Sequence, residues 1–262
     1  MEPTTYIYHD RKALTDYKLL SGAGRLVAYK NGWPEIQIQP HDIVFSMSIR
    51  PVPAGGIRIN TELAKMQATD KRLARALLTY YGVPVPKTWY CIEDAVLPYI
   101  ARPRRHWLGK NFHVVRNQEQ HDRVKSIMKQ DWYFTALYPV ESECRVMVWR
   151  DEIMVAYRKE YEGTTPEETV QERNRLRYLS RGGRAGYEPG DTIEITDRQK
   201  QICIDATKIL GLDFAGIDMM TNGDDSVICE VNSAPTIRPV FADLLKAKIN
   251  ENNHIHKFER RR

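Results

Sequence analysis

The hydrophobic and polar positions along the chain fall into short apolar runs typical of strands and longer stretches with helical spacing. The β-rich runs TYIYHD, RLVAYK and DIVFSMS come first, separated by Gly- and Pro-containing breaks. Helical spacing follows in NTELAKMQATDKRLARALLTYYG, which predicts one helix with Leu73, Leu77, Leu78 and Tyr81 on one side. This mixture of strands, helices and hairpins predicts an α+β, or mixed α/β, fold.

The rest of the chain predicts further elements of both kinds. A strand, a polar loop and a strand are predicted in YIARPRRHWLGKNFHVV, a helix in QEQHDRVKSIMKQ, and a hairpin in ECRVMVWRDEIMVAYRKEY. TDRQKQICIDATKILG predicts an amphipathic helix with Thr196 as its N-cap and Gly211 as its end. A polar, Gly- and Arg-rich stretch over residues 162–190 lacks apolar periodicity, which favours a functional loop.

One predicted hairpin carries carboxylates inside its strands. In GIDMMTNGDDSVICEVNSAP, the turn signal Asn222-Gly223 lies between two apolar-rich runs. A hairpin centred near Asp224 places Asp218 opposite Glu230, with Asn232 two residues along on the same face. The other face then carries apolar residues that would pack on the core: Ile217, Met219, Val227, Cys229 and Val231.

Two carboxylates in directly opposed positions repel each other, so the arrangement predicts a cation between them. Carboxylate and amide oxygens are hard ligands, which favours Mg²⁺, with Mn²⁺ as the alternative ion. The competing interpretation is an exposed hairpin face whose carboxylates point into solvent. If repulsion dominates, Asp218→Asn or Glu230→Gln should leave the stability of the metal-free protein unchanged or raise it.

Composition narrows the class of protein without identifying it. The chain has 262 residues, 42% apolar content and a formal net charge of +5. Its apolar runs are too short for a membrane span, and the N-terminus predicts no signal peptide. Four isolated cysteines favour a reducing, cytoplasmic location over a disulfide framework or a zinc ribbon. The tail KFERRR adds positive charge, but the sequence offers no nucleic-acid motif or aromatic platform.

Five segments together resemble the ATP-grasp ligases, and among them the ribosomal-protein glutamate ligases and glutathione synthetases. LGLDFAGIDMM…VICEVNSAPT resembles the final metal-binding segment, and ATDKRLARALLTYYGVPVPKTW the entry helix. YIARPRRHWLGKNFHVV resembles the phosphate-loop unit, ECRVMVWRDEIMVAYRKEY the arginine hairpin, and RYLSRGG the Gly-Gly segment near a second metal. The resemblance covers residues 60–239. It implies a truncated N-terminal α/β domain (1–63), a nucleotide-lid subdomain (64–138) and a C-terminal catalytic subdomain (139–262), the last two gripping ATP.

The resemblance also implies roles for individual residues. The expected metal ligands are Asp218, Glu230 and Asn232, and the expected clamps on the γ-phosphate and the acyl-phosphate are Arg145 and Arg158. The expected ATP contacts are Lys71, Arg102, Gly109 of the phosphate loop, the hinge residues Tyr133, Phe134, Thr135, Ala136 and Leu137, and either Glu141 or Glu143 at the ribose.

The implied activity is a ligase reaction between a carboxylate-bearing and an amine-bearing substrate. ATP would phosphorylate the carboxylate, and the amine would displace phosphate from the acyl-phosphate to form an amide. Two departures keep alternatives open: Arg102 replaces the family's strand lysine, and Tyr178 replaces the asparagine before the Gly-Gly segment. The alternatives are an ATP-grasp phosphotransferase and a non-catalytic nucleotide-binding subunit. A homo-oligomer is compatible with the resemblance, because proteins of this fold commonly form dimers or tetramers.

Overall fold

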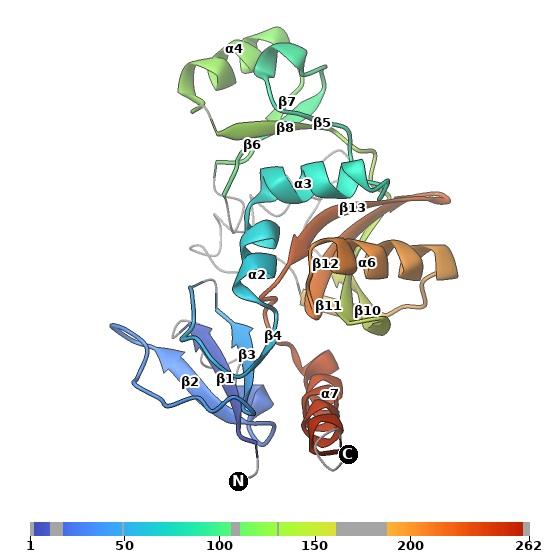
Figure 1. Ribbon diagram of the computed structural model, residues 1–262. Coiled ribbons are helices and arrows are strands. Elements are labelled where there is room, and N and C mark those ends of the chain that lie inside the picture. The colour runs from blue at the N-terminus through green and yellow to red at the C-terminus, as the bar shows by residue number, and fades with distance from the viewer. Residues whose placement is uncertain are drawn as a thin grey trace.

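The computed structural model describes residues 3–10, 18–48, 50–105, 111–129, 131–160 and 188–258. Within them the strands form three sheets, which Figure 1 shows as a lower N-terminal sheet, a central sheet and an upper lid sheet. This arrangement confirms the mixed α/β class. No helix among the described residues combines the length and the apolarity that crossing a membrane requires.

The N-terminal sheet is small and parallel. Its strands β1 (Thr5–Asp10), β2 (Arg25–Tyr29), β3 (Ile43–Met47) and β4 (Ile57–Ile59) lie in the order β2-β1-β3-β4, with the 3-10 helix η2 (Lys18–Leu20) before β2. The three β-rich runs at the start of the sequence therefore form the predicted strands. One face of this sheet shares a hydrophobic core with the central sheet and with α7 (Pro239–Phe258), which anchors the domain to the rest of the molecule.

The lid sheet is antiparallel and has a core of its own. It contains β5 (Thr88–Trp89), β6 (Tyr99–Pro103), β7 (His113–Val115) and β8 (Trp132–Ala136) in the order β5-β8-β6-β7. The helix α4 (Gln118–Ile127) and the 3-10 helix η3 (Ile92–Asp94) belong to the same unit, and Val124 of α4 and Ile92 of η3 enter its core. The chain leaves the lid through β8 and runs directly into the central sheet.

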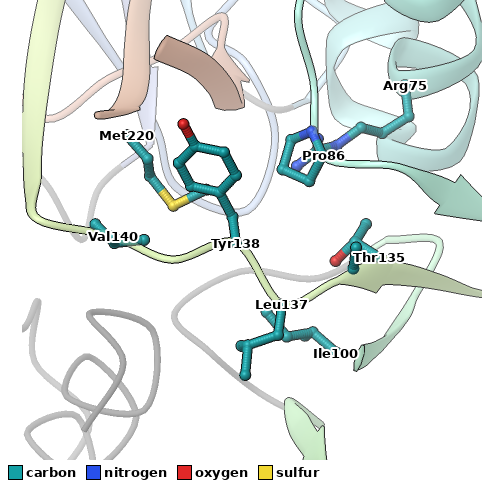
Figure 2. Close-up of a pocket in the computed structure, with 9 residues that line it drawn as sticks. Arg75, Pro86, Ile100, Thr135, Leu137, Tyr138, Val140 and Met220 are labelled. Atoms are coloured by element: carbon teal, nitrogen blue, oxygen red, sulfur yellow. The ribbon is translucent and has the colours of Figure 1, made fainter. Parts of the chain in front are cut away.

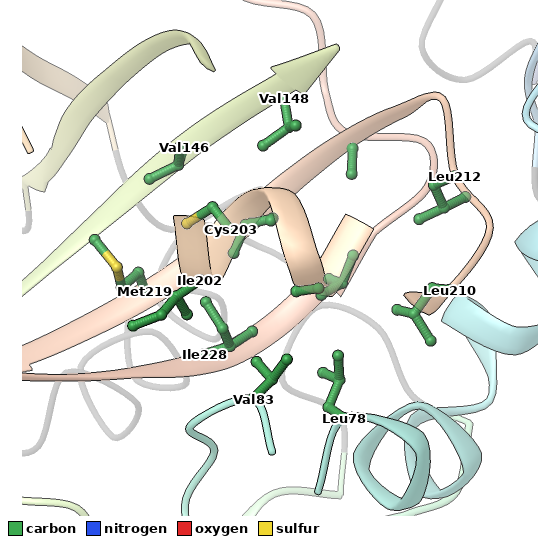
Figure 3. Packing of buried hydrophobic residues seen from close by; sticks show 14 of the residues in the cluster. Leu78, Val83, Val146, Val148, Ile202, Cys203, Leu210, Leu212, Met219 and Ile228 are labelled. Atoms are coloured by element: carbon green, nitrogen blue, oxygen red, sulfur yellow. The ribbon is translucent and has the colours of Figure 1, made fainter. Parts of the chain in front are cut away.

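The central sheet has the strand order β11-β10-β9-β12-β13. Its members are β9 (Ser142–Trp149), β10 (Glu152–Glu160), β11 (Glu188–Thr192), β12 (Phe214–Asn222) and β13 (Asp225–Asn232). The helix α6 (Asp197–Ile209) covers one face, where its apolar side packs against β9 and the β12–β13 hairpin (Figure 3). Thr196 caps α6 in a capping box with Gln199, as the sequence predicts for this N-terminus.

The predicted long helix is interrupted by Asp70. The structure has two helices, α2 (Glu62–Thr69) and α3 (Lys71–Tyr80), and Asp70 is extended between them. The Asp70 side chain accepts the Leu73 amide as the N-cap of α3 and also pairs with Arg104. Leu78 is buried and Leu77 packs against the core, whereas Leu73 and Tyr81 are exposed, so the predicted apolar side of this helix is only partly buried.

Asn60 joins the N-terminal region to the central sheet. Its backbone lies in the left-handed region at φ 61°, and the residue is fully buried. The side-chain oxygen accepts the amides of Asp213 and Phe214, each at 2.9 Å, while its amide nitrogen donates to Phe214 O at 2.7 Å and Ser233 O at 2.9 Å. A single side chain thus fixes the start of β12 and the segment after β13.

Candidate active site

The β12–β13 hairpin brings the two predicted metal carboxylates together. Asp218 pairs directly with Glu230, as the sequence predicts, and Gly216 pairs with Asn232. The route to this register differs from the prediction, since Asn222 pairs with Asp225 and the turn itself is Gly223-Asp224. A β-bulge lies between the Met219–Ile228 pair and the Asp218–Glu230 pair. It shifts the register by one residue and so restores the predicted pairing at the site.

The bulge also changes which side chains reach the core. Met219 pairs with Ile228, and Cys229 is the extra residue on β13. Ile228, and not Val227 or Cys229, therefore joins Ile217 and Met219 in the core under α6. The prediction that Val227 and Cys229 lie on that face is wrong, because one added residue exchanges the two faces of a strand.

A second bulge decides which cation of β10 reaches the site. Ile153 pairs with Val148 but Val155 pairs with Met147, so Met154 is the extra residue. As a result Arg158 pairs with Cys144, on the face under α6, and its side chain is exposed. The structure does not bring Arg158 to Arg145, and Lys159 takes the place predicted for it.

Asp218 lies within a buried group of charges. Arg145 binds it through both carboxylate oxygens, Nε to Oδ1 at 2.5 Å and Nη2 to Oδ2 at 3.0 Å. Lys159 Nζ lies 2.9 Å from the same Oδ1 and also pairs with Glu143. Glu143 is thus held by a cation of the site. Since Asp218 already has two cationic partners, the expectation that its removal leaves the metal-free protein equally stable loses its basis.

Helix α3 holds the other carboxylate. Lys71 Nζ lies 2.9 Å from Glu230 Oε1 and donates to Val231 O at 2.9 Å. Arg75 donates to the carbonyls of Ile228 and Cys229. Cationic side chains of α3 thereby bind backbone carbonyl groups on the outer edge of β13, where another strand would otherwise pair. Lys71 reaches the site, though its observed contact is with Glu230.

Arg102 lies on β6 beside this edge. Its guanidinium carbon is 4.7 Å from the centre of the Phe112 ring, and its Nε is buried without a hydrogen-bond partner among the described residues. Burial alone would lower the pKa of Arg102, but Tyr133, Cys229 and Glu230 outweigh it and raise the pKa, so the group stays charged. A buried, charged and incompletely satisfied guanidinium is suited to an anionic ligand.

The predicted hinge leads from the lid sheet to the central sheet. Tyr133, Phe134 and Thr135 are buried in β8. The amides of Ala136 and Leu137 donate to Lys87 O at 2.8 Å and Pro98 O at 3.2 Å, so both are used within the protein. Their expected contact with adenine remains a prediction.

A pocket opens beside this hinge. It is lined by Arg75, Pro86, Ile100, Thr135, Ala136, Leu137, Tyr138, Val140 and Met220. Figure 2 shows the Tyr138 ring between Met220 and Pro86. The Tyr138 hydroxyl is buried and has no hydrogen-bond partner among the described residues, so the pocket contains a polar group that a ligand could satisfy.

The remaining predicted contacts are placed as follows. Glu141 accepts the Gly223 amide at 2.8 Å and so supports the hairpin turn. Gly109, Tyr178 and residues 162–187 of the Gly- and Arg-rich stretch lie outside the described residues. Among the described residues, no three His, Cys, Asp or Glu side chains gather as a metal cluster. The donor set Asp218, Glu230 and Asn232 has only two carboxylates, and it fits Mg²⁺ because that ion takes few protein ligands.

Gly216 gives Arg145 the room to reach Asp218. A Cβ at position 216 would lie 2.7 Å from Pro235 Cβ and 3.0 Å from Arg145 Nη1. We expect Gly216→Ala to lower the free energy of unfolding by about 2 kcal/mol, since overpacking forces neighbours to shift. Urea unfolding would measure it against Gly32→Ala, where an added Cβ meets no atom within 4 Å. If the two variants were equally stable, Pro235 and Arg145 would be shown to move away from the added Cβ without loss of stability.

Comparison with known proteins assigns the family. The RimK-like ATP-grasp domain family matches residues 107–255, more than half of the chain. The protein therefore belongs to the RimK-like ATP-grasp family, which confirms the resemblance to ATP-grasp ligases.

Curated relatives include a probable alpha-L-glutamate ligase of Haemophilus influenzae (strain PittEE), 25% identical over 203 residues. That match covers 71% of this chain and 62% of the relative, so the chain spans less than two thirds of its length. A probable alpha-L-glutamate ligase of Methanococcoides burtonii is 37% identical over 62 residues, covering 24% of this chain and 19% of the relative.

Solved structures show the same fold. The ATP-grasp ligase PsnB complexed with a minimal precursor superposes with a TM-score of 0.68 at 16% identity, covering 96% of this chain and 99% of PsnB. D-alanine–D-alanine ligase from Bacillus anthracis superposes with a TM-score of 0.63 at 13% identity, and the match covers 98% of this chain and 99% of that ligase. The fold of the chain is that of the ATP-grasp ligases, along almost its whole length.

Proposed function

We propose that the protein is an ATP-dependent carboxylate–amine ligase that forms an amide bond and releases ADP and phosphate. The observation that carries the proposal is the direct pairing of Asp218 with Glu230, beside Asn232, in a chain of this family. In the proposed site Asp218, Glu230 and Asn232 hold Mg²⁺, or Mn²⁺. The metal, when bound, would supply positive charge that balances the phosphates of ATP.

Cationic side chains of the protein would stabilise the negative charge that the metal leaves uncompensated. Arg145 has a planar fork that suits phosphate or carboxylate oxygens, and Lys159 provides a compact charge beside it. The substrate carboxylate attacks the γ-phosphorus, the bond from phosphorus to the bridging oxygen breaks, and ADP leaves. The amine then attacks the acyl carbon, phosphate leaves and the amine loses a proton. Such a reaction needs positioning and charge stabilisation, with no protein nucleophile.

The comparisons favour amino-acid or peptide substrates. The curated relatives carry the name glutamate ligase, and PsnB was solved with a precursor peptide and with Mg and ADP. We propose that this chain joins an amino acid or peptide carboxylate to an amine, in the cytoplasm, as its unpaired cysteines favour.

Hydroxylamine trapping tests the proposal. The protein would be incubated with Mg²⁺, ATP and hydroxylamine against a panel of amino acids, acidic peptides and small carboxylic acids, with ADP release followed in parallel. We expect one class of acid to give a hydroxamate together with ADP, because hydroxylamine intercepts an acyl-phosphate. Substrate-dependent ADP release without hydroxamate would contradict the ligase and indicate a phosphotransferase. Absence of both with every acid would favour a non-catalytic nucleotide-binding subunit.

A further inference from the structure

We propose that Lys159, Arg145 and Lys71 are internal counterions of the metal site, so that divalent metal and nucleotide each bind tightly only when the other is present. The inference rests on the proposed function of the site, and it concerns the protein's own side chains. Its basis is that the carboxylates at the site are already neutralised by cations of the same chain.

Among the described residues, each carboxylate of the site is paired with a cation of the same chain. Asp218 contacts Arg145 and Lys159, Glu143 contacts Lys159, and Glu230 contacts Lys71. Within these contacts, three carboxylates therefore face three cations of the described chain. Only 8% of the Asp218 side chain, 3% of Glu143, 10% of Arg145 and 4% of Lys159 is exposed, so solvent screens these charges little.

A divalent cation entering alone would disrupt these ion pairs. To coordinate Asp218 it must displace Arg145 or Lys159 from an oxygen that each holds at 3.0 Å or less. The displaced cation would then lose an ion pair in a buried site, which is costly. Binding of the metal alone is therefore opposed by the protein.

Nucleotide phosphates remove this opposition. The polyphosphate carries more negative charge than a divalent metal neutralises, and Arg and Lys both bind phosphate oxygens well. Arg145 and Lys159 can transfer from Asp218 to phosphate, and Lys71 can transfer from Glu230, as the metal takes the carboxylates. Coupling between two ligands is reciprocal, so nucleotide affinity must depend on metal by the same factor.

Manganese binding measures the coupling directly. Free Mn²⁺ would be quantified by electron paramagnetic resonance in titrations of the full chain, with and without a non-hydrolysable ATP analogue. For the unaltered protein we expect the analogue to tighten Mn²⁺ binding at the protein by about a hundredfold, beyond Mn²⁺ bound to free analogue. Equal Mn²⁺ affinity in both titrations would overturn the inference.

A variant tests the assignment to Lys159. Lys159→Met removes one counterion, and we expect Mn²⁺ alone to bind about tenfold more tightly while the coupling factor falls about tenfold. Lys208→Met is the matched control, since Lys208 pairs with Asp151 on the exposed surface at 3.0 Å, and it should change neither value. Lys71→Met, which releases Glu230, gives the same test if Lys159→Met does not fold. Unchanged binding of Mn²⁺ alone in both variants would contradict the inference.

The failure of this inference is distinguishable from failure of the proposed function. A protein that binds nucleotide and metal independently would overturn the counterion exchange and leave the ligase proposal intact. A protein that binds no nucleotide analogue at any metal concentration would overturn both.

Discussion

Replacing Asp218 by asparagine should abolish Mg²⁺-dependent turnover and lower the free energy of unfolding of the metal-free protein by about 3 kcal/mol. The loss of stability follows from the contacts of the carboxylate. Arg145 and Lys159 both bind it, and all three residues are buried. Its removal leaves two cations with less compensation, which outweighs any relief of repulsion from Glu230. Urea unfolding in the presence of a chelator would measure the change.

Two further variants separate this cause from a general effect on the hairpin. Asp225→Asn, at the exposed end of the same hairpin, should change stability by less than about 0.5 kcal/mol. Asp218→Asn combined with Arg145→Met should be more stable than Asp218→Asn alone, because Arg145 forms its ion pair with Asp218 and is removed together with it. A metal-free Asp218→Asn protein as stable as the unaltered one would show that the ion pairs contribute nothing, and that the carboxylates repel as the sequence alone suggests.

Replacing Asn60 by glycine should lower the free energy of unfolding by about 3 kcal/mol, because four side-chain hydrogen bonds are lost and buried backbone groups are left unpaired. Glycine tolerates the left-handed φ of 61°, so the substitution removes the hydrogen bonds without adding backbone strain. We expect the loss to appear in a single urea transition, since Asn60 joins the N-terminal region to β12 and to Ser233.

Asn111→Gly is the matched control for this variant. Asn111 also has a left-handed backbone, at φ 53°, but its side chain is exposed. It should lose less than about 1 kcal/mol. If both variants lost the same stability, the effect would come from the flexibility of glycine, and the hydrogen bonds of Asn60 would not explain it.

Local signals in the sequence were sufficient for several elements. The apolar spacing and the Thr196 cap define α6, and the β-rich runs define the parallel strands of the N-terminal sheet. In both elements residues close in the sequence decide the structure. The sequence also predicts the pairing of Asp218 with Glu230, but this pairing forms because the bulge at Cys229 offsets a one-residue error in the predicted turn.

The two β-bulges could not be predicted in the same way. An added residue at Met154 or Cys229 leaves the apolar pattern plausible in either register, yet it exchanges the faces of the strand. For this reason the structure presents Lys159 where the resemblance to the family implies Arg158. The interruption of the helix at Asp70 has a local signal, since Asp70 caps α3 by accepting the Leu73 amide, but its ion pair with Arg104 is a distant contact that helical spacing does not reveal.

Isotope transfer from the substrate tests the central claim most directly. A carboxylate substrate identified by hydroxylamine trapping would be labelled with ¹⁸O in both carboxylate oxygens and converted with ATP and the amine. The released inorganic phosphate would then be analysed by mass spectrometry. We predict that one ¹⁸O atom appears in each phosphate, because the carboxylate oxygen attacks phosphorus and leaves with it. Phosphate without label, in a reaction that forms the amide, would contradict the proposed ligase mechanism.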